Sequence, residues 1–128
     1  MIVETWDREG RSTIMKISDR KELEEFFHTF PDREPFYCEF VKSDYKLSVC
    51  VRRDLGSVQH SPANSDPPYM VAITTAPHDP NDEVDFFIGS ELTQLSMRHA
   101  VPLDTAKEII RYFLETGQRS PAVLWEEV

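Results

Sequence analysis

No uninterrupted apolar run in the sequence approaches the ~18–20 residues that a membrane-spanning helix needs. The first residues, Met1 to Trp6, lack both a basic start and a continuous apolar stretch, so they do not have the pattern of a secretion signal. Only two cysteines occur, Cys38 and Cys50, and the reducing cytosol disfavours a disulfide between them. These absences predict a cytoplasmic protein in which both cysteines are small buried side chains.

Motifs of the common catalytic classes are also missing. The sequence has no HExxH, CxxC or GxSxG pattern, and its four glycines stand singly, so it offers no glycine-rich loop to cradle a phosphate. The adjacent acids Glu24/Glu25 and Glu126/Glu127 would point in different directions on a helix or a strand, which argues against acid–base pairs. We therefore expect a protein that is not an enzyme and that carries no cofactor.

One segment keeps a metal-dependent alternative open. Donor groups that suit a divalent ion gather there within a few residues of one another. Loops rich in Asp, Asn and Pro have the same composition without any metal, so the pattern alone does not identify a metal site. A small metal-dependent enzyme or sensor is the alternative function, and its ligands would be His78, Asp79, Asp82 and Glu83.

Lysine and arginine are absent from the middle of the chain, between Arg53 and Arg98. This basic-free stretch contains seven acids, whereas the rest of the chain has 16 acids and 14 bases, so the stretch carries −7 of the net charge of −9. Such a balance disfavours a direct nucleic-acid binder. It favours a basic protein partner, because complementary fields speed encounter, although solubility alone is the alternative explanation. The seven acids are Asp54, Asp66, Asp79, Asp82, Glu83, Asp85 and Glu91.

The length of 128 residues suits one domain, residues 1–128, and apolar residues at helical spacing predict two helices in it. The first helix begins at a capping box formed by Asp19 and Glu22 and ends at Pro31. The second begins near Pro102, which suits a first turn, and ends at Gly117, a usual left-handed stop. The buried stripes are Leu23, Phe26, Phe27 and Phe30 in the first helix, and Ala106, Ile109, Ile110, Phe113 and Leu114 in the second.

Strand-like segments occupy much of the remaining chain. Residues 2–7 and 13–17 flank Arg8-Glu9-Gly10 as a hairpin, and the prolines of residues 61–68 predict a protruding loop. The predicted fold is α+β: an antiparallel sheet of about six to eight strands with the two main helices packed on one face, in two layers. Alternating apolar and polar residues predict further strands at 36–41, 46–52, 69–75, 84–88, 92–97 and 122–126.

The closing stretch, Val101 to Val128, combines several short patterns: V-x-L-x-x-A at the start of the second helix, an aromatic and apolar helix end, T-G-x-R, and a final W-x-E strand. Together they resemble the C-terminal signature of the first-numbered family of polymorphic-toxin immunity proteins. Phe86 to Ser90 is similar to that family's aromatic strand ending in glycine. The proline that follows Arg119 stands one residue later than in the family, at Pro121. Such motifs identify the fold family and do not mark the toxin-binding surface.

The resemblance implies an immunity protein that binds and neutralises a cognate bacterial toxin encoded by a neighbouring gene, often a nucleic-acid deaminase and in other cases a nuclease. A toxin that acts on nucleic acid needs a basic cleft for phosphates, so an acidic segment suits its occlusion. We expect one copy of the chain to block the active site or substrate cleft in a one-to-one complex. A secretion adaptor or chaperone is a further alternative. The expected toxin-facing residues are Asp79, Asp82, Glu83, Asp85 and Glu91, with Tyr69 and Trp6 as aromatic anchors.

Overall fold

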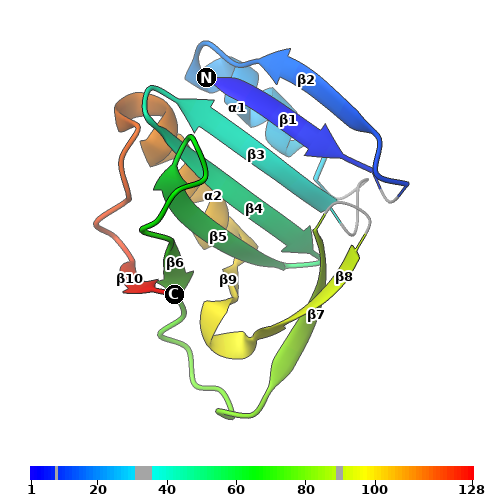
Figure 1. Ribbon diagram of the computed structural model, residues 1–128, viewed down its shortest axis with the longest axis vertical. Coiled ribbons are helices and arrows are strands. Elements are labelled where there is room, and N and C mark those ends of the chain that lie inside the picture. Colours follow the sequence, from blue (N-terminus) through cyan, green and yellow to red (C-terminus); the bar gives the residue numbers. More distant parts are fainter. Residues whose placement is uncertain (8, 31–35, 89–90) are drawn as a thin grey trace.

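A computed structural model describes residues 1–7, 9–30, 36–88 and 91–128. Its described part contains an eight-stranded antiparallel sheet in the order β10-β6-β5-β4-β3-β1-β2, with the short β9 paired to β5 (Figure 1). A separate hairpin consists of β7 (Glu83–Ile88) and β8 (Glu91–Ser96). The strands of the large sheet are β1 (Ile2–Trp6), β2 (Ser12–Lys16), β3 (Phe36–Lys42), β4 (Tyr45–Arg52), β5 (Leu55–Pro62), β6 (Met70–Ile73), β9 (Val101–Pro102) and β10 (Leu124–Glu127).

Both predicted helices form, and their ends follow the local signals of the sequence. In α1 (Arg20–Phe27) the Oδ1 of Asp19 accepts a hydrogen bond from the backbone N–H of Glu22 at 2.8 Å, as a capping box requires. The helix α2 (Leu103–Thr116) follows Pro102 and ends at Gly117, whose φ of +70° places it in the left-handed region. Pro31, expected to end α1, lies outside the described residues, as do Arg8 in the first hairpin and Gly89 and Ser90 in the family-like strand.

The two helices and one set of strand side chains share a single hydrophobic core. Figure 1 shows both helices behind the large sheet. The glycine at position 56 lets β5 pass close to α2, because a Cβ placed there would lie 2.9 Å from the Cβ of Ala106. Trp125 is half-buried beside this core and donates its indole N–H to the carbonyl of Ser120 at 2.9 Å. All nine apolar side chains that the helical spacing predicts are buried in this core; eight of them lie within α1 and α2, and Phe30 follows the end of α1.

The opposite face of the sheet carries a second, smaller core. Phe86 of β7 is fully buried there against Tyr37 and Cys50, two side chains that point away from the helices. The α+β class and the large antiparallel sheet with two helices are therefore as expected, but a two-layer description leaves out the β7–β8 hairpin. We call the sheet surface that the helices do not cover the open face. Cys38 is also buried, and burial raises the pKa of the Cys50 thiol to about 12.

The strand β5, which is central in the sheet, was not predicted from the sequence. A two-residue turn at Arg53 and Asp54 joins β4 to β5, and Arg53 adopts a positive φ of 57° without the glycine that usually marks such turns. Ser61 and Pro62, predicted to begin a loop, are the last residues of β5. No helix among the described residues is long and apolar enough to cross a membrane.

His60 of β5 is a titratable group inside the main core. Its ring stacks on Tyr45 with centroids 4.9 Å apart and meets Phe113 edge-on at 5.9 Å. Burial lowers the pKa of His60, while the carbonyl of Gly117 acts in the opposite direction. His60 therefore takes up a proton less readily in the folded chain than in the unfolded chain.

This burial predicts a pH-dependent stability. As pH falls below about 6.5, the unfolded chain binds a proton at His60 before the folded chain does. The free energy of unfolding therefore keeps its full value above that pH and decreases below it. Between about pH 7.5 and pH 5.5 the loss from one such group is at most about 1.4 kcal/mol. Urea unfolding of the wild type and of His60→Gln at both pH values measures it, with the exposed His28→Gln as the control. Equal pH dependence in wild type and His60→Gln would contradict the prediction.

Candidate partner-binding site

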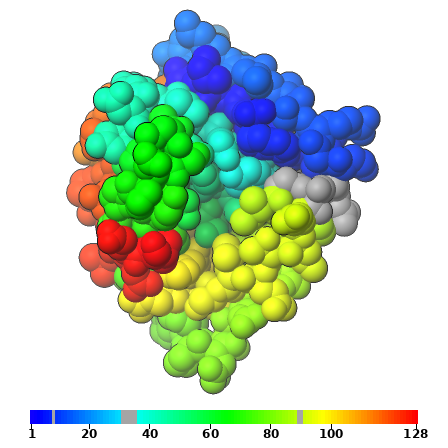
Figure 2. All heavy atoms as spheres, viewed as in Figure 1, coloured from blue at the N-terminus to red at the C-terminus, as the bar shows by residue number. Residues whose placement is uncertain are grey.

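Three of the predicted toxin-facing acids lie together where an exposed turn leads into β7: Asp79 and Asp82 in the turn, and Glu83 as the first residue of the strand. We call residues 79–83 the acidic projection, because the segment between β6 and β7 forms one end of the molecule (Figures 1 and 2). Asp79 holds the turn: its Oδ1 accepts the N–H of Asn81 at 2.8 Å, and its carbonyl accepts the N–H of Asp82 at 3.0 Å. The carbonyl of Asp82 accepts the N–H of Met97 at 3.0 Å, which ties the projection to the end of β8.

The carboxylates of the acidic projection have no cationic neighbour within the described residues. Asp79, Asp82 and Glu83 are all exposed, and no lysine, arginine or histidine of that part of the chain lies within ion-pair distance of them. The projection therefore presents three negative charges on a backbone that hydrogen bonds hold in place. Fixed charges of one sign attract and orient a basic surface.

Two other predicted acids lie outside the projection. Asp85 is half-buried on β7 and faces Arg52, whose Nη1 lies 3.8 Å from its Oδ2 and donates to its backbone carbonyl at 2.9 Å. This contact fastens the hairpin to β4, so Asp85 has a structural task. Glu91 is exposed at the far end of the hairpin, directly opposite Ile88. The five predicted toxin-facing acids are therefore divided: three lie in the projection, Asp85 contacts Arg52, and Glu91 lies at the other end of the hairpin.

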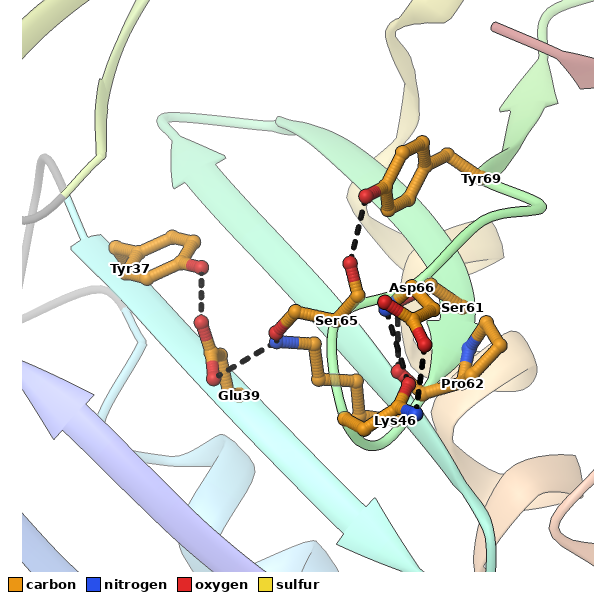
Figure 3. Close-up of polar contacts among 9 residues, drawn as sticks. Tyr37, Glu39, Lys46, Ser61, Pro62, Ser65, Asp66 and Tyr69 are labelled. Atoms are coloured by element: carbon orange, nitrogen blue, oxygen red, sulfur yellow. Dashed lines mark hydrogen bonds and ion pairs between the residues drawn. The ribbon is translucent and has the colours of Figure 1, made fainter.

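A chain of polar contacts crosses the open face and joins the loop after β5 to β3 (Figure 3). The hydroxyl of Tyr37 donates to Oε2 of Glu39 at 2.6 Å, and Oε1 of Glu39 lies 3.7 Å from Nζ of Lys46. Lys46 donates to Oγ of Ser65 at 2.8 Å, and the hydroxyl of Tyr69 donates to the carbonyl of Ser65 at 2.6 Å. Burial and the Glu39 carboxylate both raise the pKa of Tyr37, so its hydroxyl stays protonated.

The two aromatic residues predicted as anchors lie at opposite ends of this arrangement. Trp6 is the cross-strand neighbour of Tyr37, and their ring centroids are 5.2 Å apart. Tyr69 is half-exposed and hydrogen-bonded within the loop. Neither residue lies in the acidic projection, so the predicted anchors and the predicted acids belong to separate parts of the surface.

Between the β7–β8 hairpin and the sheet lies a groove of about 390 Å³ on the open face. Its floor is made by polar and small side chains of β3, β4 and β5: Tyr37, Ser48, Cys50, Ser57 and Gln59. Its walls include Ile88 and Leu95 of the hairpin on one side, and Val71, His99 and Val128 on another. We call this hollow the open-face groove. None of its floor residues was predicted from the sequence to be functional.

At one rim of the groove, His99 and its neighbour Arg98 both contact the carboxylate of Glu126. Its Nε2 lies 2.9 Å from Oε1 of Glu126, and Arg98 donates to Oε2 of the same carboxylate at 2.9 Å. Hydrogen bonds from Arg98 and His99 lower the pKa of Glu126, so this carboxylate is ionised at neutral pH. Arg98, the first basic residue after the basic-free stretch, is thus paired with Glu126 of the same chain.

The residues of the metal-dependent alternative do not converge. The Nδ1 of His78 lies 3.0 Å from the carbonyl of Ala76, and Oδ1 of Asp79 is bound by a backbone N–H. Among the described residues, which include all four proposed ligands, no three His, Cys, Asp or Glu side chains are grouped closely enough to hold a metal ion. The geometry therefore does not support this alternative.

Comparison with known proteins agrees with the pattern of the closing segment. No curated protein matches the chain. A family model described as immunity protein Imm1 matches residues 12–127, which include both helices and every strand from β2 to β10. The match spans far more than the closing segment, so it confirms the family that this segment indicated. The chain belongs to the Imm1 family of immunity proteins.

Proposed function

We propose that this immunity protein neutralises a toxin that acts on nucleic acid, by placing its acidic projection in the cleft that the toxin uses for phosphates. The first candidate for this toxin is a deaminase. The observation that carries the proposal is the exposed turn of Asp79, Asp82 and Glu83, which no cation of the described residues neutralises. Phosphate-binding clefts are basic, and a fixed acidic turn competes with nucleic acid for the same positive charges.

The same chemistry fits a nuclease, which is the second candidate toxin. Both enzyme classes hold a phosphate backbone, so the acidic projection does not distinguish them. The reaction that the purified toxin performs, base deamination or strand cleavage, separates the two candidates. In either case the immunity protein acts by occupying the cleft, as one copy per toxin in the cytoplasm, and contributes no chemistry of its own.

Co-expression tests the proposal directly. Cells that carry the toxin encoded by the adjacent gene should grow when this chain is produced with it, and the two proteins should purify together. Light scattering should give the mass of a one-to-one complex, and added nucleic acid should compete with the immunity protein for the toxin. Absence of both growth rescue and co-purification would remove the proposal, and a complex that still binds nucleic acid would exclude occlusion of the cleft.

A further inference from the structure

The open-face groove has the shape and lining of a pocket for one long side chain. Its volume is about 390 Å³, at the lower end of the range of ligand sites. Ile88 and Leu95 provide an apolar wall, whereas Ser48 and Gln59 of neighbouring strands provide hydroxyl and amide groups on the floor. In Figure 2 the surface of the central strands lies recessed between the loop after β5, the first hairpin and the β7–β8 hairpin.

At one end of the groove, beside its lining, the sheet carries a surplus of negative charge: Glu39 accepts the Tyr37 hydroxyl and lies opposite Ser48, and both of these residues line the groove. Glu39 lies directly opposite Glu4 on the adjacent strand, and both side chains are half-buried on the open face. Like charges in this position repel each other. Lys46 contacts Glu39 at 3.7 Å, and no cation of the described residues pairs with Glu4, so this end of the sheet favours an additional positive group.

The cations around the groove are already engaged by acids. Arg98 is bonded to Glu126, Arg52 contacts Asp85, and Lys46 contacts Glu39. An anionic ligand would have to displace one of these carboxylates. A cation needs no such displacement, because carboxylate and hydroxyl oxygens retain lone pairs that accept further hydrogen bonds.

Among cationic side chains, arginine matches the lining best. Its planar guanidinium has five N–H donors for separate acceptors, such as Ser48 and Gln59 of the lining and the carboxylate of Glu39 beside it, whereas a lysine ammonium is a compact point charge. Its aliphatic stem can pack on the wall formed by Ile88 and Leu95.

We propose that the open-face groove binds an arginine side chain of the cognate toxin, as an anchor separate from the acidic projection. This inference rests on the proposed function for the identity of the partner. The acidic projection then sets how fast the complex forms, and the groove sets how slowly it dissociates. Arginine is among the residues that most often dominate the binding energy of interfaces, in keeping with this division.

A titration with a small probe tests the groove without the toxin. N-acetyl-argininamide should shift the NMR signals of Ser48, Gln59 and the Ile88 methyl groups, and N-acetyl-lysinamide should shift them much less. Gln59→Trp, which fills the groove, should abolish these shifts, and Glu39→Gln should weaken them while leaving an acceptor for the Tyr37 hydroxyl. Absence of shifts with argininamide, or equal shifts with both probes, would overturn the arginine assignment.

A kinetic measurement links the groove to the toxin. Gln59→Trp and Glu39→Gln should each raise the dissociation rate of the toxin complex by about tenfold and leave the salt dependence of association unchanged. Glu25→Gln on the exposed side of α1 is the matched control. If the wild type forms no complex with the toxin, the proposed function fails. The probe titration alone then shows whether the groove binds an arginine side chain. If wild type and both groove variants dissociate at the same rate, only the groove inference fails.

Discussion

Replacement of Phe113 by alanine should lower the free energy of unfolding by about 3–5 kcal/mol, because it opens a cavity at the centre of the main core. Phe113 is fully buried on α2 and contacts the ring of His60 on β5. Its side chain therefore joins the helix to a central strand of the sheet. The lost burial and the cavity left behind act in the same direction, since the surrounding helix and strand relax only partly.

Such a loss is a large share of the ~5–15 kcal/mol that stabilises a typical domain. Denaturant unfolding measures it, with Leu124→Ala as the control because Leu124 is 61% exposed and should cost less than about 0.5 kcal/mol. Phe113→Leu should fall between the two, since it keeps most of the apolar volume. A Phe113→Ala loss as small as that of Leu124→Ala would show that α2 does not depend on this contact.

Phe113 also shows what the sequence predicted well. The helices could be predicted because their signals are local: a capping residue at Asp19, apolar residues at helical spacing, and Gly117 as a stop. Each signal depends on neighbours within a few positions, so it does not require knowledge of the tertiary structure. The first hairpin and the strands with clear alternation were predicted for the same reason.

The central strand β5 could not be predicted in this way. Gly56, Ser57 and His60 have low or neutral strand preference, and the residues between them do not alternate clearly in hydropathy. Its position depends on pairing with β4, β6 and β9 and on the close approach of α2 at Gly56. These long-range contacts override the local preference of the segment.

The candidate surface was predicted only in part, because acids that are close in the sequence can have basic neighbours from other strands in the folded chain. The partner of Asp85 is Arg52, which stands just before the basic-free stretch and reaches the hairpin from β4. The open-face groove was missed for a related reason. Ser48 and Gln59 are ordinary strand residues in the sequence, and they acquire a common environment only when the hairpin packs over the sheet.

The acidic projection leads to the largest expected effect on binding. The double variant Asp82→Lys/Glu83→Lys should slow association with the toxin by about 10–100-fold at low ionic strength, because it reverses the field that guides a basic cleft toward the projection. It should also make the association rate less dependent on salt. Asp79 and Asp85 are left unchanged, since Asp79 holds the turn and Asp85 contacts Arg52.

A matched control separates this local effect from net charge. Glu25→Lys/Glu115→Lys changes the net charge by the same amount, from −9 to −5, with both substitutions at exposed helix positions. Stopped-flow association over a range of salt concentrations should show a strong effect for the projection variant and a weak one for the helix variant. Equal slowing by both would indicate attraction by the overall charge of the chain. Unchanged association rates in both variants would place the toxin contact away from the projection. Thermal unfolding of each variant checks that the fold is retained.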